Sequence, residues 1–133
     1  VPRALEAHIA RAVSRIRWRA SDAREFAGRF LTEPKAHVYF RPPARPLPRA
    51  RFAARAAREG LALDPRARLL FSGTMFFLNG ERVAVPAEAR RLVKRLADRR
   101  HLRPPPESRA AFWDTMHAWY LEGIVACEGE EKT

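Results

Sequence analysis

The first third of the chain contains two stretches in which apolar residues recur every three or four positions. Between Pro2 and Trp18 charged residues occupy the other faces, which is the pattern of an amphipathic helix. A second helix is predicted to begin at Ser21 or Asp22 and to end by Glu33, because Pro34 disfavours a helical residue before it. The apolar side of the first helix holds Leu5, Ile9, Val13 and Ile16, and that of the second holds Phe26, Phe30 and Leu31.

These two helices need a partner surface. They bury too little area between themselves to offset the backbone entropy lost on ordering, about 1–2 kcal/mol per residue. The partner is the rest of the chain, a missing domain or a second copy, and self-association about a two-fold axis is the usual solution. We predict that six residues pack within this helical unit or across a homodimer interface: Leu5, Ile9, Val13, Ile16, Phe26 and Phe30.

A proline-rich stretch follows the helices. Residues 36–40 have the composition of a short strand or extended arm, and residues 41–48 include four prolines, which is typical of a stiff polyproline-like linker. We place a domain boundary here. Residues 1–47 form a helical dimerisation segment with its linker, and residues 48–133 form a second domain.

The second domain mixes helix and strand patterns. A helix is predicted from Pro48 to Arg58, followed by strands near residues 68–71, 74–78 and 81–85. Ser72-Gly73 and Asn79-Gly80 suit two-residue hairpin turns, which require positive φ. Helices over 86–100 and 107–121 and a closing strand over 124–126 complete the domain. A helix, a three-stranded meander, two helices and a closing strand predict an α+β, winged-helix-like fold.

The formal net charge of +11 by itself suggests nucleic acid as a partner, but we do not favour that partner, because the charge is spread along the chain. Counted by predicted domain, residues 1–47 carry +6 and residues 48–133 carry +5, so no single basic block stands out. The predicted helix over 86–100 has an outer basic row, whereas the last helix bears more acidic than basic residues, which argues against a DNA-reading role. Candidate contact residues are Arg90, Arg91, Lys94 and Arg95.

No catalytic or metal-binding motif is found. The four histidines are far apart, none is followed two positions later by Asp or Glu, and no glycine-rich phosphate loop occurs.

The single cysteine, Cys127, makes a reducing cytoplasm the expected compartment. No apolar run is long enough to cross a membrane, and a start at Val1 without a signal-peptide pattern leads us to expect a fragment of a longer protein.

Several short motifs together resemble one family. The chain is similar to the C-terminal region of bacterial ribosomal oxygenases, which are JmjC-type cupin hydroxylases. The resemblance covers nearly the whole chain. It is carried by Ile16-Arg17-Trp18, Phe30-Leu31-Thr32-Glu33-Pro34-Lys35, Phe40-Arg41-Pro42-Pro43, Leu69-Leu70-Phe71, Phe76-Phe77-Leu78-Asn79-Gly80-Glu81, and Trp119-Tyr120-Leu121 followed by Gly123.

This resemblance implies a parent dioxygenase with three parts: a catalytic cupin that binds Fe(II) and 2-oxoglutarate, a helical dimerisation segment and a winged-helix domain. The family is associated with hydroxylation of a side chain on a large-subunit ribosomal protein, an arginine in the bacterial members. The His-x-Asp…His ligands of the cupin are absent here, so the resemblance assigns no catalytic residue to this chain.

Two functions follow from the sequence. The leading interpretation is the non-catalytic dimerisation and winged-helix portion of an oxygenase that hydroxylates a ribosomal protein. The alternative is an independent nucleic-acid-binding winged-helix module. They differ in salt dependence, because phosphate contacts weaken steeply with added salt whereas apolar helix packing does not.

Overall fold

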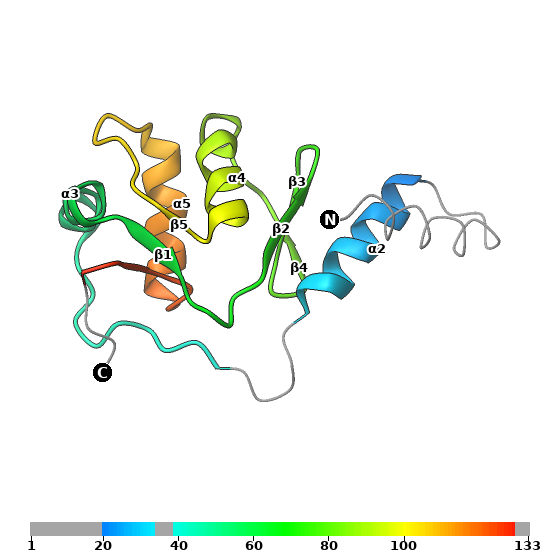
Figure 1. Cartoon of the computed structure of the whole chain (residues 1–133), viewed down its shortest axis with the longest axis horizontal. Coiled ribbons are helices and arrows are strands. Elements are labelled where there is room, and N and C mark those ends of the chain that lie inside the picture. Colours follow the sequence, from blue (N-terminus) through cyan, green and yellow to red (C-terminus); the bar gives the residue numbers. More distant parts are fainter. Residues whose placement is uncertain (1–19, 34–38, 130–133) are drawn as a thin grey trace. The chain divides into compact units, whose positions relative to one another are not determined.

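The computed structural model describes residues 20–33 and 39–129, which divide into two packed units (Figure 1). The α2 unit holds helix α2 and the strands β2, β3 and β4. The α5 unit holds the other helices and strands. The predicted helix over 2–18 lies outside the described residues, as do residues 36–38 of the predicted strand over 36–40, whose last two residues belong to no strand.

In the α2 unit, β2 (Leu69–Ser72), β3 (Met75–Leu78) and β4 (Glu81–Val83) form an antiparallel meander in that order. Each strand lies within two residues of its predicted bounds. Asn79 and Gly80 form the second turn with φ of 51° and 88°, because this tight hairpin requires positive φ. The predicted meander is confirmed.

Helix α2 (Ala20–Thr32) packs against all three strands through its small side chains (Figure 1). Ala23 and Ala27 are buried, and a β-carbon added at Gly28 would overlap the buried ring of Phe77. The helix approaches the sheet closely because these residues lack bulk. Ser21 and Asp22 lie within this helix, so the prediction that one of them marks its start is wrong.

The end of α2 is fixed to the turn between β3 and β4. The hydroxyl of Thr32, which is fully buried, donates to the carbonyl of Gly28 at 2.8 Å and accepts the backbone N–H of Gly80 at 2.8 Å. Two of the sequence motifs behind the family resemblance, around Thr32 and around Gly80, therefore meet in one structural contact.

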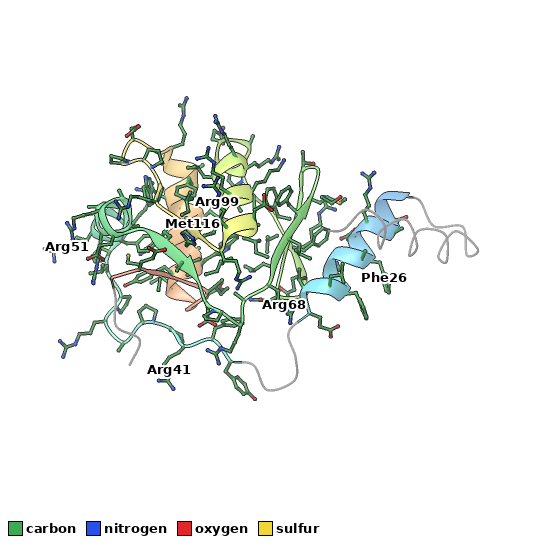
Figure 2. The ribbon with its side chains drawn as sticks, viewed as in Figure 1. Phe26, Arg41, Arg51, Arg68, Arg99 and Met116 are labelled. Atoms are coloured by element: carbon green, nitrogen blue, oxygen red, sulfur yellow. The ribbon has the colours of Figure 1, made fainter. Side chains whose placement is uncertain are left out.

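The α5 unit is built around α5 (Ala110–Leu121), which contacts α3, α4 and β6 (Figure 1). Helix α3 spans Arg49–Glu59, and α4 (Arg90–Arg99) follows a single 3-10 turn, η1 (Ala87–Ala89). Since α5 is covered from several sides, five of its residues lie in the core of the unit: Phe112, Trp113, Met116, Trp119 and Tyr120 are buried. Figure 2 shows Met116 within this packing.

A second three-stranded antiparallel sheet, with the order β5-β1-β6, belongs to the α5 unit. Its strands are β1 (Leu61–Leu63), β5 (His101–Leu102) and β6 (Val125–Cys127). The closing strand was predicted one residue too early, and its partner β1 and the edge strand β5 were not predicted at all. Strands of two or three residues leave no alternating pattern in the sequence.

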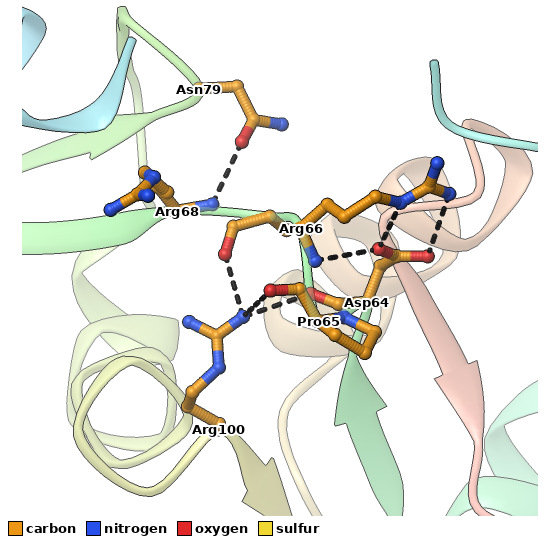
Figure 3. A network of polar contacts seen from close by, with 7 residues as sticks. Asp64, Pro65, Arg66, Arg68, Asn79 and Arg100 are labelled. Atoms are coloured by element: carbon orange, nitrogen blue, oxygen red, sulfur yellow. Dashed lines mark hydrogen bonds and ion pairs between the residues drawn. The ribbon is translucent and has the colours of Figure 1, made fainter. Parts of the chain in front are cut away.

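One polar network joins the end of α4 to the loop after β1 (Figure 3). The guanidinium of Arg100 donates to the carbonyl oxygens of Asp64 and Ala67 at 2.9 and 2.7 Å. The nearly buried carboxylate of Asp64 accepts the backbone N–H of Arg66 at 2.9 Å and forms an ion pair with its side chain. Figure 3 also shows a bond of the α2 unit, in which the side-chain oxygen of Asn79 accepts the N–H of Arg68 at 2.9 Å.

The described residues thus contain four α-helices and two small antiparallel sheets, an α+β fold consistent with a winged helix, as predicted. No helix within residues 20–33 and 39–129 has the length and apolar character to cross a membrane. Packing alone does not say which parts fold independently, so the domain boundary between residues 47 and 48 stays a prediction.

Candidate functional site

The exposed face of α2 carries two neighbouring aromatic rings. Phe26 and Phe30 lie one helical turn apart, with ring centroids 6.2 Å apart and planes inclined by 12°. They are 46% and 62% exposed, and Figure 2 shows Phe26 pointing away from the strands. The rings remain outside because the small residues of α2 occupy the side that contacts the sheet.

These rings border an open hollow. Its other lining residues are Arg29 and Glu33 of α2 and the turn residues Asn79, Gly80 and Glu81. Arg29 is held by Glu25 at 3.0 Å, and Glu25 also lies 3.7 Å from Arg82. We call Phe26, Arg29, Phe30 and Glu33 the α2 face.

The chemistry of the α2 face is that of a binding surface. Neighbouring exposed aromatic rings with a charged margin are typical of protein interfaces rather than of catalysis. Of the six residues predicted to pack in the helical unit or at a dimer interface, the structure brings Phe26 and Phe30 together, while Leu5, Ile9, Val13 and Ile16 lie outside the described residues. The dimer interface stays a prediction.

The four basic residues predicted on the helix over 86–100 fall into two pairs on α4. Arg91 and Arg95 are exposed, whereas Arg90 and Lys94 are half-buried. The Nε of Arg90 donates to the carbonyl of Val85 at 3.1 Å, so this side chain helps to hold the start of its own helix. Only the first pair is fully presented to a partner.

Helix α5 has the wrong surface for reading DNA bases. Its aromatic residues are buried, so they form a core and not a base-stacking surface. Its most exposed positions are Ala110, Asp114, Ala118 and Leu121, none of them basic. Asp114 forms an ion pair with Arg49 of α3.

The proline-rich stretch is bound to α5, which sequence reasoning did not foresee. The backbone N–H of Leu47 donates to the hydroxyl of Tyr120 at 3.0 Å, and the carbonyl of Leu47 lies 2.9 Å from Nε2 of His117. A β-carbon at Gly123 would overlap the backbone of Arg41. We call residues 41–48 the strap.

Among the described residues, no group of three or more His, Cys, Asp or Glu side chains is placed to hold a metal ion. His101 pairs with Glu128 at 3.6 Å, and His117 faces the strap and the ring of Phe52. Neither histidine is therefore arranged with further ligands in the part of the chain that the structure describes.

A protein-family model described as a ROXA-like winged helix matches residues 15–126. The match runs across both packed units and includes the α2 face, the strap, α4 and α5. No protein with a curated description matches the sequence significantly.

Among solved structures, those of the ribosomal oxygenase YcfD from Escherichia coli are similar. The structure of YcfD alone has a TM-score of 0.66 at 20% identity, with 97% of this chain covering 36% of that one. The complex with cobalt and succinic acid has a TM-score of 0.64 at 22% identity, with 80% of this chain covering 31% of that one. The complex with cobalt and 2-oxoglutarate has a TM-score of 0.63, also at 22% identity, with coverages of 79% and 30%.

At this level of identity the likeness to these structures shows a shared fold. The chain spans about a third of the length of the solved proteins that it matches. What the remaining two-thirds of such a protein do is therefore a separate question from the fold of this part.

Proposed function

Because the chain belongs to the ROXA-like winged-helix family, as its sequence motifs predicted, we propose that it is the non-catalytic dimerisation and winged-helix portion of an oxygenase that hydroxylates a ribosomal protein. The observation that carries this proposal is the family match over residues 15–126. The similarity to a ribosomal oxygenase of Escherichia coli over a third of its chain supports it.

In this proposal the chemistry belongs to a cupin domain elsewhere in the parent protein, which holds Fe(II) and 2-oxoglutarate. This assignment of metal and cosubstrate is supported by the similar YcfD structures, which contain cobalt together with 2-oxoglutarate or succinic acid. The metal and the cosubstrate would supply the oxidising chemistry there, while the residues of this chain position the catalytic domains.

The positioning role rests on the α2 face. An exposed pair of phenylalanine rings costs free energy in water, and burial of apolar surface stabilises by about 25 cal/mol per Å². A second copy offers the same face in a two-fold arrangement, which is the commonest oligomeric symmetry. The proposed interface comprises Phe26 and Phe30 with Leu5, Ile9, Val13 and Ile16.

Replacing Phe30 by aspartate is expected to convert a dimer of this chain into a monomer, because the interface would then bury an unpaired carboxylate. Light scattering after size-exclusion chromatography measures the mass, at both low and high salt. The wild-type dimer should be insensitive to salt, since apolar burial is not screened.

The matched control is Tyr39→Asp. Tyr39 is another strongly exposed aromatic residue, 75% exposed, and it lies outside the α2 unit. Its variant should keep the wild-type mass. A monomeric wild-type chain, or equal dissociation by both variants, would contradict a dimer formed through the α2 face.

The substrate class is tested in cells. In the source organism, removal of the gene that encodes this chain is expected to leave one large-subunit ribosomal protein lighter by a single oxygen atom. Intact-mass spectrometry of purified ribosomes detects that difference, and restoring the gene should restore the oxygen. Identical masses in the two strains would contradict hydroxylation of a ribosomal protein.

An independent nucleic-acid-binding module remains the alternative. It is weakened by the exposed positions of α5, which carry no basic side chain for a groove. A monomeric chain together with unchanged ribosomal proteins would favour it.

A further inference from the structure

Positive charge is concentrated in one short part of the α5 unit. The twenty residues from Arg90 to Arg109 contain eight basic and two acidic side chains, a net charge of +6 out of +11 for the whole chain. This segment consists of α4 and the connection that leads to α5. More than half of the excess charge therefore lies on one helix and one loop.

Five of these arginines are available to a partner. Arg91, Arg95 and Arg99 are exposed and follow one another at intervals of four residues, so they lie along one side of α4. Arg103 and Arg109 are exposed in the connection. Within the part of the chain that the structure describes, none of the five forms an ion pair with a carboxylate. We call these five residues the arginine stripe.

Two of the other three basic residues of the segment, Arg90 and Arg100, are bonded to backbone carbonyls of the same unit. The side chain of Arg90 is bonded to the carbonyl of Val85, and that of Arg100 is bonded to the carbonyls of Asp64 and Ala67. Among the described residues, the five arginines of the stripe make no side-chain bond of this kind, so they differ from Arg90 and Arg100.

The surroundings of the stripe fit phosphate better than protein. The large exposed hydrophobic residues among those described are Phe26, Phe30, Tyr39 and Leu121, and none lies between Arg90 and Arg109. A protein interface is usually built around an apolar centre, whereas phosphate binding requires mainly charge. The planar guanidinium matches two oxygens of a phosphate at once.

The order of the helices indicates which part of a nucleic acid is contacted. When two such consecutive helices bind a duplex, the second enters the groove and the first crosses the backbone. Here the first helix, α4, has the cations, and the exposed residues of the second, α5, include Asp114 and Leu121 but no arginine or lysine. The cations that a backbone contact requires are therefore present on α4, whereas α5 exposes none for a base contact.

We propose that the arginine stripe binds the phosphate backbone of duplex nucleic acid without reading its sequence. The inference does not depend on the proposed oxygenase role, because it rests on the charge and exposure of α4 and its connection. The shared ligand chemistry is the phosphodiester backbone, and duplex RNA and duplex DNA are its two sources.

The test is fluorescence anisotropy of the 133-residue chain with labelled duplex RNA and duplex DNA, each in two unrelated sequences. We expect equal affinity for the two sequences of a kind, and a steep fall in affinity with added salt. The variant R91E/R95E should weaken binding by about tenfold or more and lower the salt slope by about 2, since two phosphate contacts are lost.

The matched control is R51E/R58E, which removes the same amount of positive charge from exposed positions of α3. Its affinity should stay within about twofold of the wild type, because the lost charges are not phosphate contacts. Circular dichroism checks that both variants fold. Binding to RNA alone or to DNA alone supports the proposal and identifies the source.

Three results would overturn it. The first is no binding of the wild-type chain at low salt, and the second is a clear preference for one sequence. The third is an equal loss of affinity in the α3 and α4 variants, since binding would then reflect only the net charge of the chain.

Discussion

Replacing Phe52 by alanine is expected to lower the free energy of unfolding of this chain by about 3–5 kcal/mol. Phe52 is fully buried on α3 and contacts three rings of α5. Its centroid lies 4.5 Å from that of Tyr120 in a stacked pair, 5.6 Å from that of His117 and 6.5 Å from that of Trp113. The cavity left by truncation removes apolar burial and three aromatic contacts together.

Such a loss is a large part of the 5–15 kcal/mol that stabilises a typical domain. Urea denaturation followed by far-ultraviolet circular dichroism measures it. The control is Tyr39→Ala, which removes an aromatic ring that is 75% exposed and should change stability by no more than about 0.5 kcal/mol. Similar losses in the two variants would show that Phe52 is not a centre of the core.

The sequence predicted the elements that carry a local signal. Helix α3 was predicted within one residue, and the Asn79-Gly80 turn was found because few residues tolerate positive φ. Helix α4 begins at Arg90, four residues later than predicted, because a 3-10 turn over Ala87–Ala89 precedes it. Helix α5 begins three residues later than predicted, at Ala110, because a turn closed by the bond from the Ser108 N–H to the Pro105 carbonyl precedes it.

Features that depend on distant partners were missed. Strands β1 and β5 pair across about forty residues of sequence, Leu61 opposite Leu102, and each is too short to show periodicity. The strap was interpreted as a stiff polyproline-like linker, because its prolines give no signal of the bonds that Leu47 makes to His117 and Tyr120.

The candidate site illustrates a second limit. Hydrophobicity identified Phe26 and Phe30 as one side of α2, but it did not show that the sheet-facing side uses small residues instead. The ring of Phe77 can approach the helix this closely only because Gly28 lacks a side chain. Such a contact depends on the packing of residues far apart in the sequence, so no local pattern predicts it. The excess of positive charge between Arg90 and Arg109 is visible in the sequence, but a count over the two predicted domains averages it out.

Replacing Gly123 by alanine is expected to lower the free energy of unfolding by about 3 kcal/mol or more, because two penalties combine. Gly123 ends α5 with φ of 82°, which is unfavourable for any residue with a side chain, and its N–H donates to the carbonyl of Tyr120 at 3.0 Å. The added β-carbon would also overlap the carbonyl oxygen of Arg41 in the strap, which is backbone and has no rotamer by which to move aside.

Gly73→Ala separates these two penalties. Gly73 also has positive φ, 60°, but nothing lies within 4 Å of the position that a β-carbon would occupy. Its variant should lose only the conformational cost, about 1–2 kcal/mol. The difference between the two variants in urea denaturation measures how firmly the strap is held against the end of α5. Equal losses would mean that residues 41–48 move away from α5 at little cost, and the bonds of Leu47 to His117 and Tyr120 would then contribute little to stability.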